Sequence, residues 1–226
     1  LGLAPSIGKL LDIFAPGAAL AIALGRLSFL FNFADRGKVF IENEANRRLP
    51  IGSAVINVSS GATEWRFATF FIQALIAAAL FVVLLIVFFY LPTLLLKNGK
   101  HAHGMTFLVF TVIYFSTEIL MDSTRYDSSF LHSNGFVSIV QILSAVVMVL
   151  SIVMFSVRLV RSMGWRYWFP ALWVPILGLL GGAGYMEYHV QRHGDEALFA
   201  YTVMSGCLIG VILLSVVIYI LALTGK

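Results

Sequence analysis

The sequence lacks the charge of a soluble protein. Only 12% of its 226 residues are Asp, Glu, Lys or Arg, whereas 60% are hydrophobic, and the mean hydropathy is +0.93. Soluble domains carry roughly 25% charged residues. This composition excludes a water-soluble globular domain and indicates an integral membrane protein.

Cysteine is nearly absent as well. Cys207 is the single cysteine and lies within an apolar run, so the sequence holds no disulfide framework and no cysteine metal site. The net charge of +4 comes from basic residues near the ends of apolar runs, where membrane proteins normally keep them. This placement argues against a nucleic-acid-binding protein.

Long hydrophobic runs are abundant, and a helix needs about 20 apolar residues to cross a bilayer. Six stretches qualify or come close: 11–33, 68–96, 105–121, 136–157, 168–186 and 197–223. The alternating pattern of a membrane β-barrel is missing, which leaves helices as the spanning structure. The sequence therefore predicts an all-α polytopic membrane bundle of about six transmembrane helices, forming a single integral membrane domain over residues 1–226.

Two links between the predicted helices, 97–104 and 158–167, contain basic residues and no acidic residues. The positive-inside rule places both links, and the C-terminal Lys226, in the cytoplasm. The remaining loops are then extracytoplasmic and cover 34–67, 122–135 and 187–196. In the longest of these, the β-branched runs 38–42 and 53–59 predict a small hairpin-like head inserted between the first two helices.

Arg26 is a full charge within the apolar run 15–32, with no acid nearby in the chain. An arginine near a helix centre costs about 2.5–3.5 kcal/mol unless it meets a partner or reaches the interface. Gly17, Ala21 and Gly25 form a small-residue ridge that favours close helix packing, and so a buried Arg26 suited to a phosphate or carboxylate. The alternative is an arginine that extends to the membrane surface.

A second group of charged residues lies at the C-terminal end of the third predicted helix. Glu118, Asp122 and Arg125 follow at i, i+4 and i+7, hence on one helical face, with Asp127 just beyond. An acid within an apolar span favours a functional site, although a structural Asp122–Arg125 salt bridge is the alternative. Both groups lie toward the predicted outer side, which predicts one charged cavity able to hold an anionic lipid headgroup.

The segment DIFAPGAALAIALGRLSFLFNFADRGK resembles the signature of the prolipoprotein diacylglyceryl transferase family, approximately D-x-x-A-P-G-x7-G-R-[IL]-[GA]-N-F-[IL]-[NA]-G-E-x-x-G-[RK]. The matching residues are Asp12, Ala15, Pro16, Gly17, Gly25, Arg26, Leu27, Asn32, Gly37 and Lys38. The segments FIQAL (71–75) and EILMDSTRYDSS (118–129) are similar to later elements of the family and occur in the same order. The resemblance covers about residues 10–150.

This resemblance implies transfer of a diacylglyceryl group from phosphatidylglycerol to the thiol of a lipobox cysteine in a preprotein, at the bacterial inner membrane. It requires neither a metal nor any other cofactor. The implied phospholipid-binding residues are Arg26, Arg125, Asn32 and Gly37. The implied catalytic residues are Asp122 and Glu118, which either position the arginines or take the thiol proton.

Phe29, Ala34 and Glu118 stand where the family has an asparagine, an acid and an arginine. The family also carries a His-Gly element upstream, whereas the first histidine here is His101, so we expect an N-terminally truncated sequence. Two other functions stay open: a degenerate relative that binds anionic lipid or preprotein without transfer, and a small transporter or channel.

His189 and His193 are four residues apart and lie beside Glu187 and Asp195. This spacing would let both imidazoles face one metal ion, but a polar loop at the membrane interface explains it as well. No metal is therefore assigned.

Overall fold

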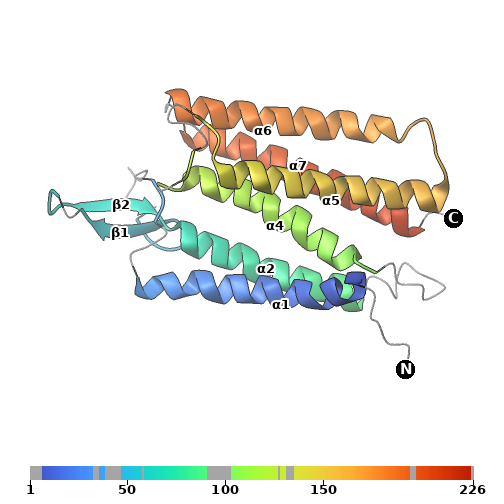
Figure 1. Cartoon of the computed structure of the whole chain (residues 1–226). Coiled ribbons are helices and arrows are strands. Elements are labelled where there is room, and N and C mark those ends of the chain that lie inside the picture. Colours follow the sequence, from blue (N-terminus) through green and yellow to red (C-terminus); the bar gives the residue numbers. More distant parts are fainter. Residues whose placement is uncertain are drawn as a thin grey trace.

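The computed structural model describes residues 7–32, 36–38, 47–57, 59–90, 103–126, 128–130, 135–193 and 197–224. Six long α-helices run roughly side by side in this part of the chain, and a β-hairpin lies at one end of the bundle (Figure 1). The helices are α1 (Ile7–Leu27), α2 (Thr69–Phe89), α4 (Met105–Thr124), α5 (Ile139–Met163), α6 (Trp173–His193) and α7 (Ala197–Thr224). The predicted all-α bundle is confirmed, because each predicted apolar stretch overlaps one of these helices.

Five helices in the described part of the chain are long and apolar enough to cross a membrane. They are α1 with the 3-10 turn η1 that follows it (Ser28–Phe31), then α2, α4, α5 and the Phe199–Thr224 part of α7. The sixth helix, α6, starts after the 3-10 turn η3 (Pro170–Leu172) and continues into the polar sequence MEYHVQRH. It therefore extends seven residues beyond the predicted stretch 168–186.

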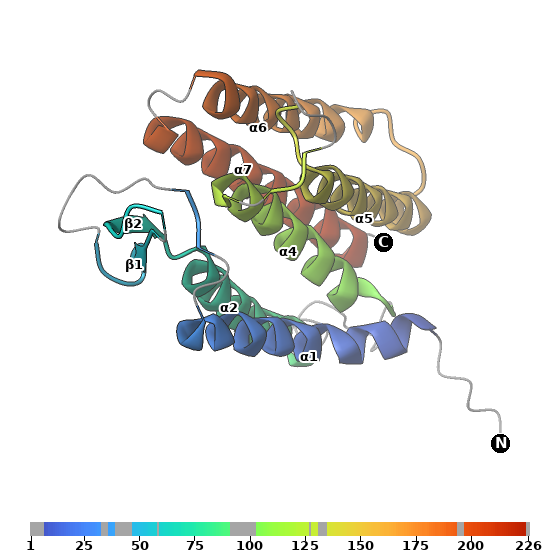
Figure 2. The ribbon, with the colours of Figure 1, turned by 60° about the vertical axis from the view of Figure 1, so that its left-hand side comes forward.

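Helix α4 lies between two groups of helices. It contacts α1 and α2 on one side and α5 and α7 on the other, an arrangement that the turned view shows (Figures 1 and 2). This helix carries hydroxyl and carboxyl groups that are costly against lipid. Thr111 Oγ1 lies 2.8 Å from Ser151 Oγ of α5, and Ser116 donates to the sulfur of Met148 at 2.9 Å. The polar residues of α4 thus explain its central position.

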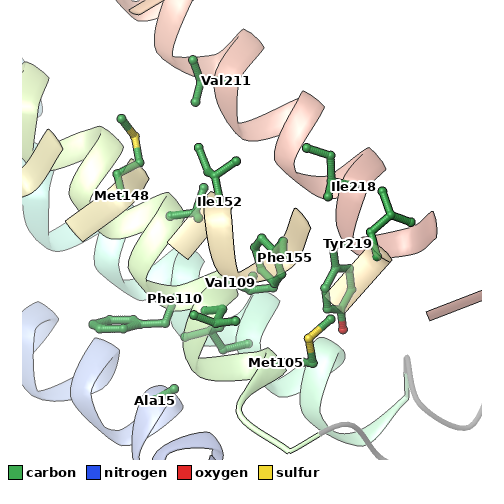
Figure 3. Packing of buried hydrophobic residues seen from close by; sticks show 14 of the residues in the cluster. Ala15, Met105, Val109, Phe110, Met148, Ile152, Phe155, Val211, Ile218 and Tyr219 are labelled. Atoms are coloured by element: carbon green, nitrogen blue, oxygen red, sulfur yellow. The ribbon is translucent and has the colours of Figure 1, made fainter. Parts of the chain in front are cut away.

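The apolar core joins α4, α5 and α7 (Figure 3). Its members on these helices include Met105, Val109, Phe110, Met148, Ile152, Phe155, Val211, Ile218 and Tyr219. The ring of Phe155 meets that of Tyr219 edge to face, with 5.5 Å between the centroids. This packing holds α4 at a fixed position for the polar groups near its C-terminal end.

The α1–α2 contact uses a different small-residue ridge from the predicted one. The buried small residues of α1 are Ala15, Ala19 and Ala23. Gly17 and Gly25 are exposed, and a Cβ added at either would meet no atom within 4 Å. The predicted Gly17–Ala21–Gly25 ridge was therefore wrong, because two ridges of equal spacing occur on this helix and only the position of α2 selects one. Arg26 follows Ala23 by three residues and so lies on the buried side.

The N-terminus of α4 is capped by α1. Asp12 Oδ2 accepts the backbone N–H of Gly104 at 2.6 Å, and Oδ1 accepts that of Phe107 at 3.0 Å. A carboxylate at this position satisfies otherwise unpaired N–H groups and matches the helix dipole. Both helices run in the same direction (Figure 1), and Arg26 follows Asp12 by 14 residues, as Glu118 follows Gly104. The cap therefore sets the register that brings Arg26 level with Glu118.

The β-hairpin consists of β1 (Gly52–Ile56) and β2 (Thr63–Phe67), paired antiparallel with Gly52 opposite Phe67. Gly61 adopts a φ of +67° in the turn and donates to the carbonyl of Asn57 at 2.8 Å. The predicted run 53–59 thus forms a strand over its first part. Its partner, however, is β2, which was not predicted, and the run 38–42 lies outside the described residues except for Lys38.

Candidate functional site

Arg26 reaches from the C-terminal end of α1 toward α4. Its Nη2 lies 3.7 Å from Glu118 Oε1, and the two side chains are 19% and 9% exposed. Direct hydrogen bonds between a guanidinium and a carboxylate are shorter, about 2.7–2.9 Å. The contact is therefore an ion pair in a mostly enclosed place, with Arg26 turned into the bundle.

Gln73 of α2 completes this contact from a third helix. Its Nε2 donates to Glu118 Oε2 at 3.0 Å, while its buried Oε1 has no hydrogen-bond partner among the described residues. A cavity of about 10 Å³, with room for about one water molecule, lies beside Arg26, Gln73 and Glu118. Sequence reasoning included Gln73 only as part of the segment FIQAL (71–75) and gave it no role, although a single amide within the otherwise apolar α2 was a usable signal.

Asp122 lies one turn beyond Glu118 and is 2% exposed. Its Oδ2 accepts the hydroxyl of Ser138, the N-cap residue of α5, which also accepts the backbone N–H of Gln141 at 3.0 Å. Gln141 in turn accepts the backbone N–H of Ser138, which completes a capping box. Asp122 thus ties the end of α4 to the start of α5.

Arg125 lies just beyond the helix that was predicted to contain it. Helix α4 ends at Thr124, and Arg125 has an extended backbone with φ −74° and ψ 148°. The charges of Arg26, Arg125 and Asp122 nevertheless all act on Glu118. We call Arg26, Gln73, Glu118, Asp122 and Arg125 the hairpin-end cluster, because they gather at the end of the bundle that carries the hairpin. Asp127 lies outside the described residues.

The other two predicted lipid-binding residues lie on the segment that follows α1. Asn32 is exposed at the end of η1, and its backbone carbonyl accepts Nη2 of Arg36 at 3.3 Å. Gly37 is buried and donates its backbone N–H to the carbonyl of Phe67 at 2.8 Å, and it also pairs with Arg125 in an isolated β-bridge. The structure thus joins Arg26 and Arg125 in one cluster, while Gly37 is a packing contact and Asn32 lies at the surface.

Comparison with known families relates this site to a known function. A model of the prolipoprotein diacylglyceryl transferase family matches residues 4–157. The chain belongs to this family. The match runs from α1 into α5 and includes every residue of the hairpin-end cluster, whereas α6 and α7 lie beyond it. Comparison with curated proteins and with solved structures finds no match.

Membership gives this chain a prolipoprotein diacylglyceryl transferase-like function in a bacterial membrane. Its substrates are, in general terms, a lipid and a preprotein. The resemblance found in the sequence is confirmed.

Gly37 belongs to the family signature, and close packing explains its presence. A Cβ at this position would lie 2.6 Å from Phe67 Cβ, 2.6 Å from Thr69 Oγ1 and 2.8 Å from the carbonyl oxygen of Thr124. Two of these three neighbours are backbone or near-backbone atoms, so they cannot move aside cheaply. Any larger residue must push the 36–38 segment away from β2 and from the end of α4.

We therefore expect Gly37→Ala to destabilise this family member by about 1–3 kcal/mol. Thermal unfolding in detergent, followed by circular dichroism, measures the change. Gly17→Ala is the matched control, because that glycine is exposed within a helix and a Cβ there meets nothing within 4 Å. The control should be neutral or slightly stabilising, and an unchanged unfolding midpoint for Gly37→Ala would contradict the packing role.

Lys38, the last residue of the family signature, connects the hairpin-end cluster to α6. Its Nζ donates to Gln191 Oε1 at 3.2 Å, and Gln191 Nε2 donates to Glu187 Oε1 at 2.9 Å. Burial lowers the pKa of Lys38, while the negative charges of Glu187 and Asp122 raise it in part. Glu187 is 4% exposed, and its Oε2 has no hydrogen-bond partner within the described ranges.

Sequence reasoning missed the link between Lys38 and Glu187. It considered Glu187 only as a neighbour of His189 and His193 in a possible metal site. In the part of the chain that the structure describes, no three His, Cys, Asp or Glu side chains are placed to hold a metal ion. Asp195 and the side chain of His193 lie outside that part.

Proposed function

We propose that the protein moves the diacylglyceryl group of phosphatidylglycerol to the thiol of a lipobox cysteine in a preprotein. The thiol sulfur forms a bond to the glyceryl carbon while the bond from that carbon to the phosphate oxygen breaks. Glycerol phosphate leaves with the bonding electrons, and a base takes the thiol proton. The lipid itself is the activated donor and the thiol comes with the preprotein, so the reaction calls for no metal and no nucleotide.

The observation that carries the proposal is the enclosed ion pair between Arg26 and Glu118, on which the charge of Arg125 also acts. Negative charge on the phosphate grows as the glyceryl carbon–oxygen bond breaks, and guanidinium groups held in place stabilise it. Arg26 and Arg125 are therefore our phosphate-binding residues. Asn32, which is exposed at the same end of the bundle, is proposed to contact the glycerol headgroup, whereas Gly37 acts through packing.

The two acids of the cluster have different partners, which suggests different roles. Both oxygens of Glu118 face a partner, Arg26 on one side and Gln73 on the other, so we assign Glu118 to positioning Arg26. Asp122 accepts the hydroxyl of Ser138 through Oδ2, and we assign its other oxygen, Oδ1, to take the thiol proton. The unpaired Oε1 of Gln73 is suited to a hydroxyl of the glycerol headgroup.

The arrangement of the helix ends supports a reaction on the outer side of the bacterial inner membrane. The ends that flank the predicted outer loops, including those of α1, α2, α4 and α5, all lie at the hairpin end (Figure 1). The ends that flank the predicted basic links lie at the other end, with the C-terminus. We therefore propose that the hairpin faces outward, where a secreted preprotein presents its cysteine, and that the C-terminus is cytoplasmic.

A second function also has a specific observation in its favour. Glu118 stands where the family has an arginine, and its carboxylate lies beside Arg26, where the phosphate would bind. The cavity there, about 10 Å³, is smaller than a phosphate group in this state of the protein. A degenerate relative that binds anionic lipid or preprotein without transfer is the corresponding alternative.

One experiment separates these functions. The purified protein is placed in phosphatidylglycerol vesicles with a synthetic lipobox peptide, and mass spectrometry follows the peptide while released glycerol phosphate is assayed. We expect the peptide to gain one diacylglyceryl group for each glycerol phosphate released, and a Cys-to-Ser peptide to gain none. Saturable lipid binding without product would establish the alternative, and neither binding nor product would contradict both.

A further inference from the structure

Two cavities adjoin at the end of the bundle opposite the hairpin, and they differ in chemistry. The first has a volume of about 620 Å³ and is lined mostly by apolar and aromatic side chains of α5 and of the 165–173 segment. The second, of about 440 Å³, is lined by Arg158, Arg161, His103 and Ser162 among others. Arg161 lines both cavities, so they form one amphipathic site.

We propose that this site binds a phosphate-bearing membrane lipid, with its phosphate on Arg158 and Arg161 and an acyl chain in the apolar cavity. It lies near the C-terminal end of α5, whereas Asp122 meets the N-terminal end of that helix (Figure 1). The site is thus separate from the hairpin-end cluster, and the inference does not rest on the proposed function.

Arg158 supplies the strongest observation for an anion. Its Nη2 donates to the carbonyl of His103 at 2.6 Å, but its buried Nη1 has no hydrogen-bond partner among the described residues. A buried donor without an acceptor is costly, and a phosphate oxygen would satisfy it. Asp12 acts on Arg158 electrostatically, but both of its oxygens accept backbone N–H groups of the α4 N-terminus. Asp12 therefore does not serve as the acceptor for Nη1 within the described residues.

The apolar cavity supplies the argument for a lipid over a soluble anion. Val157 and Phe169 belong to its lining, and the ring of Trp173 is held as a wall because its Nε1 donates to Ser156 Oγ at 3.2 Å. Trp165, at its edge, is 73% exposed, as expected of an aromatic residue at the membrane interface. The volume lies within the range of ligand pockets, and apolar walls next to two cations match an acyl chain attached to a phosphate.

Tryptophan quenching tests this site directly. The purified protein carrying Trp65→Phe, which removes the tryptophan of the hairpin, is titrated in detergent with phosphatidylglycerol that has brominated acyl chains. We expect saturable quenching, because Trp165 and Trp173 line the apolar cavity. Arg161→Gln should weaken the apparent affinity about tenfold, the effect of losing one hydrogen bond to a charged group. Arg166→Gln, an exposed arginine of the same link that lines neither cavity, should change it less than about twofold.

A second variant tests the apolar half without touching a charge. Val157→Trp fills the cavity and should also reduce quenching, so the site remains testable if Arg161→Gln does not fold. Equal affinity for a brominated diacylglycerol, which has the acyl chains but no phosphate, or unchanged binding in both variants, would overturn the proposal. So would complete displacement by glycerol phosphate at the same concentration as lipid, since that result would indicate a site for a soluble anion.

Discussion

Arg26→Ala is expected to lower diacylglyceryl transfer to a lipobox peptide by at least about 100-fold, the usual effect of removing one group that stabilises a developing negative charge. Arg26 is the cation that α1 supplies to the cluster, and its guanidinium lies 3.7 Å from Glu118. The measurement is the initial rate of peptide labelling in phosphatidylglycerol vesicles. Transfer at the wild-type rate would rule out the role proposed for Arg26.

Loss of the ion pair is the main confounding effect, because Arg26→Ala leaves the carboxylate of Glu118 buried without its cation. The double variant Arg26→Gln with Glu118→Gln removes both charges and should unfold at a temperature closer to that of the wild type. Its transfer should nevertheless stay as low as that of Arg26→Ala. A double variant that recovers both stability and transfer would show that Arg26 serves the fold alone.

Arg26→Lys tests the shape of the cation. Lysine keeps the charge but has a single ammonium group, whereas a guanidinium can bind two phosphate oxygens at once. We expect an intermediate rate, between those of the wild type and Arg26→Ala. Arg166→Ala, at the other end of the bundle, is the control for a general effect of removing an arginine.

Asp122→Asn is expected to lower transfer at neutral pH by about 100-fold or more, as found when a general base is removed. Asparagine has the same shape and still offers an oxygen to the hydroxyl of Ser138, so the hydrogen bond between α4 and the start of α5 is kept. The proton acceptor is lost, however. The measurement is again the labelling rate, now as a function of pH.

The pH profile separates a base from a structural residue. A free cysteine thiol has a pKa of about 8.5, so above this pH it ionises without help. Asp122→Asn should therefore regain much of its rate as the pH rises through this range. Ser138→Ala removes the hydrogen bond to Asp122 and the cap of α5, at a cost of about 1 kcal/mol in stability, but it should keep most of the transfer. Equal losses of transfer in both variants, at every pH, would show that Asp122 only holds the helices together.

One alternative that the sequence left open, whether Arg26 is buried or extends to the membrane surface, was decided by neighbours from other helices. Helix packing on the ridge of Gly17, Ala21 and Gly25 was predicted from the spacing of these residues, and this prediction was wrong because the ridge is exposed. Helix α2 packs instead on the alanine ridge that begins at Ala15. The conclusion drawn for Arg26 still holds in the structure, because Arg26 lies on the side of the helix that α2 and α4 cover.

Gln73 and Glu187 show a second limit of prediction from sequence, which concerns contacts between helices. Each is a single polar residue in or beside apolar sequence, and the sequence around it assigns it no partner. Gln73 donates to Glu118, which lies 45 residues further along the chain. Glu187 accepts Gln191, and Gln191 in turn accepts Lys38, which lies 153 residues earlier in the chain. One-dimensional patterns record spacing along one helix and cannot show which helices adjoin.

By itself, the sequence determined the membrane setting, the number of helices and the family, because apolar length, charge and an ordered signature are properties of the chain alone. It also singled out Arg26, Glu118, Asp122 and Arg125. Only the tertiary structure decided which of these charges meet and which groups hold them. The physical reason is that contacts between helices depend on register and rotation, which the cap from Asp12, the alanine ridge and the packing of α4 fix together.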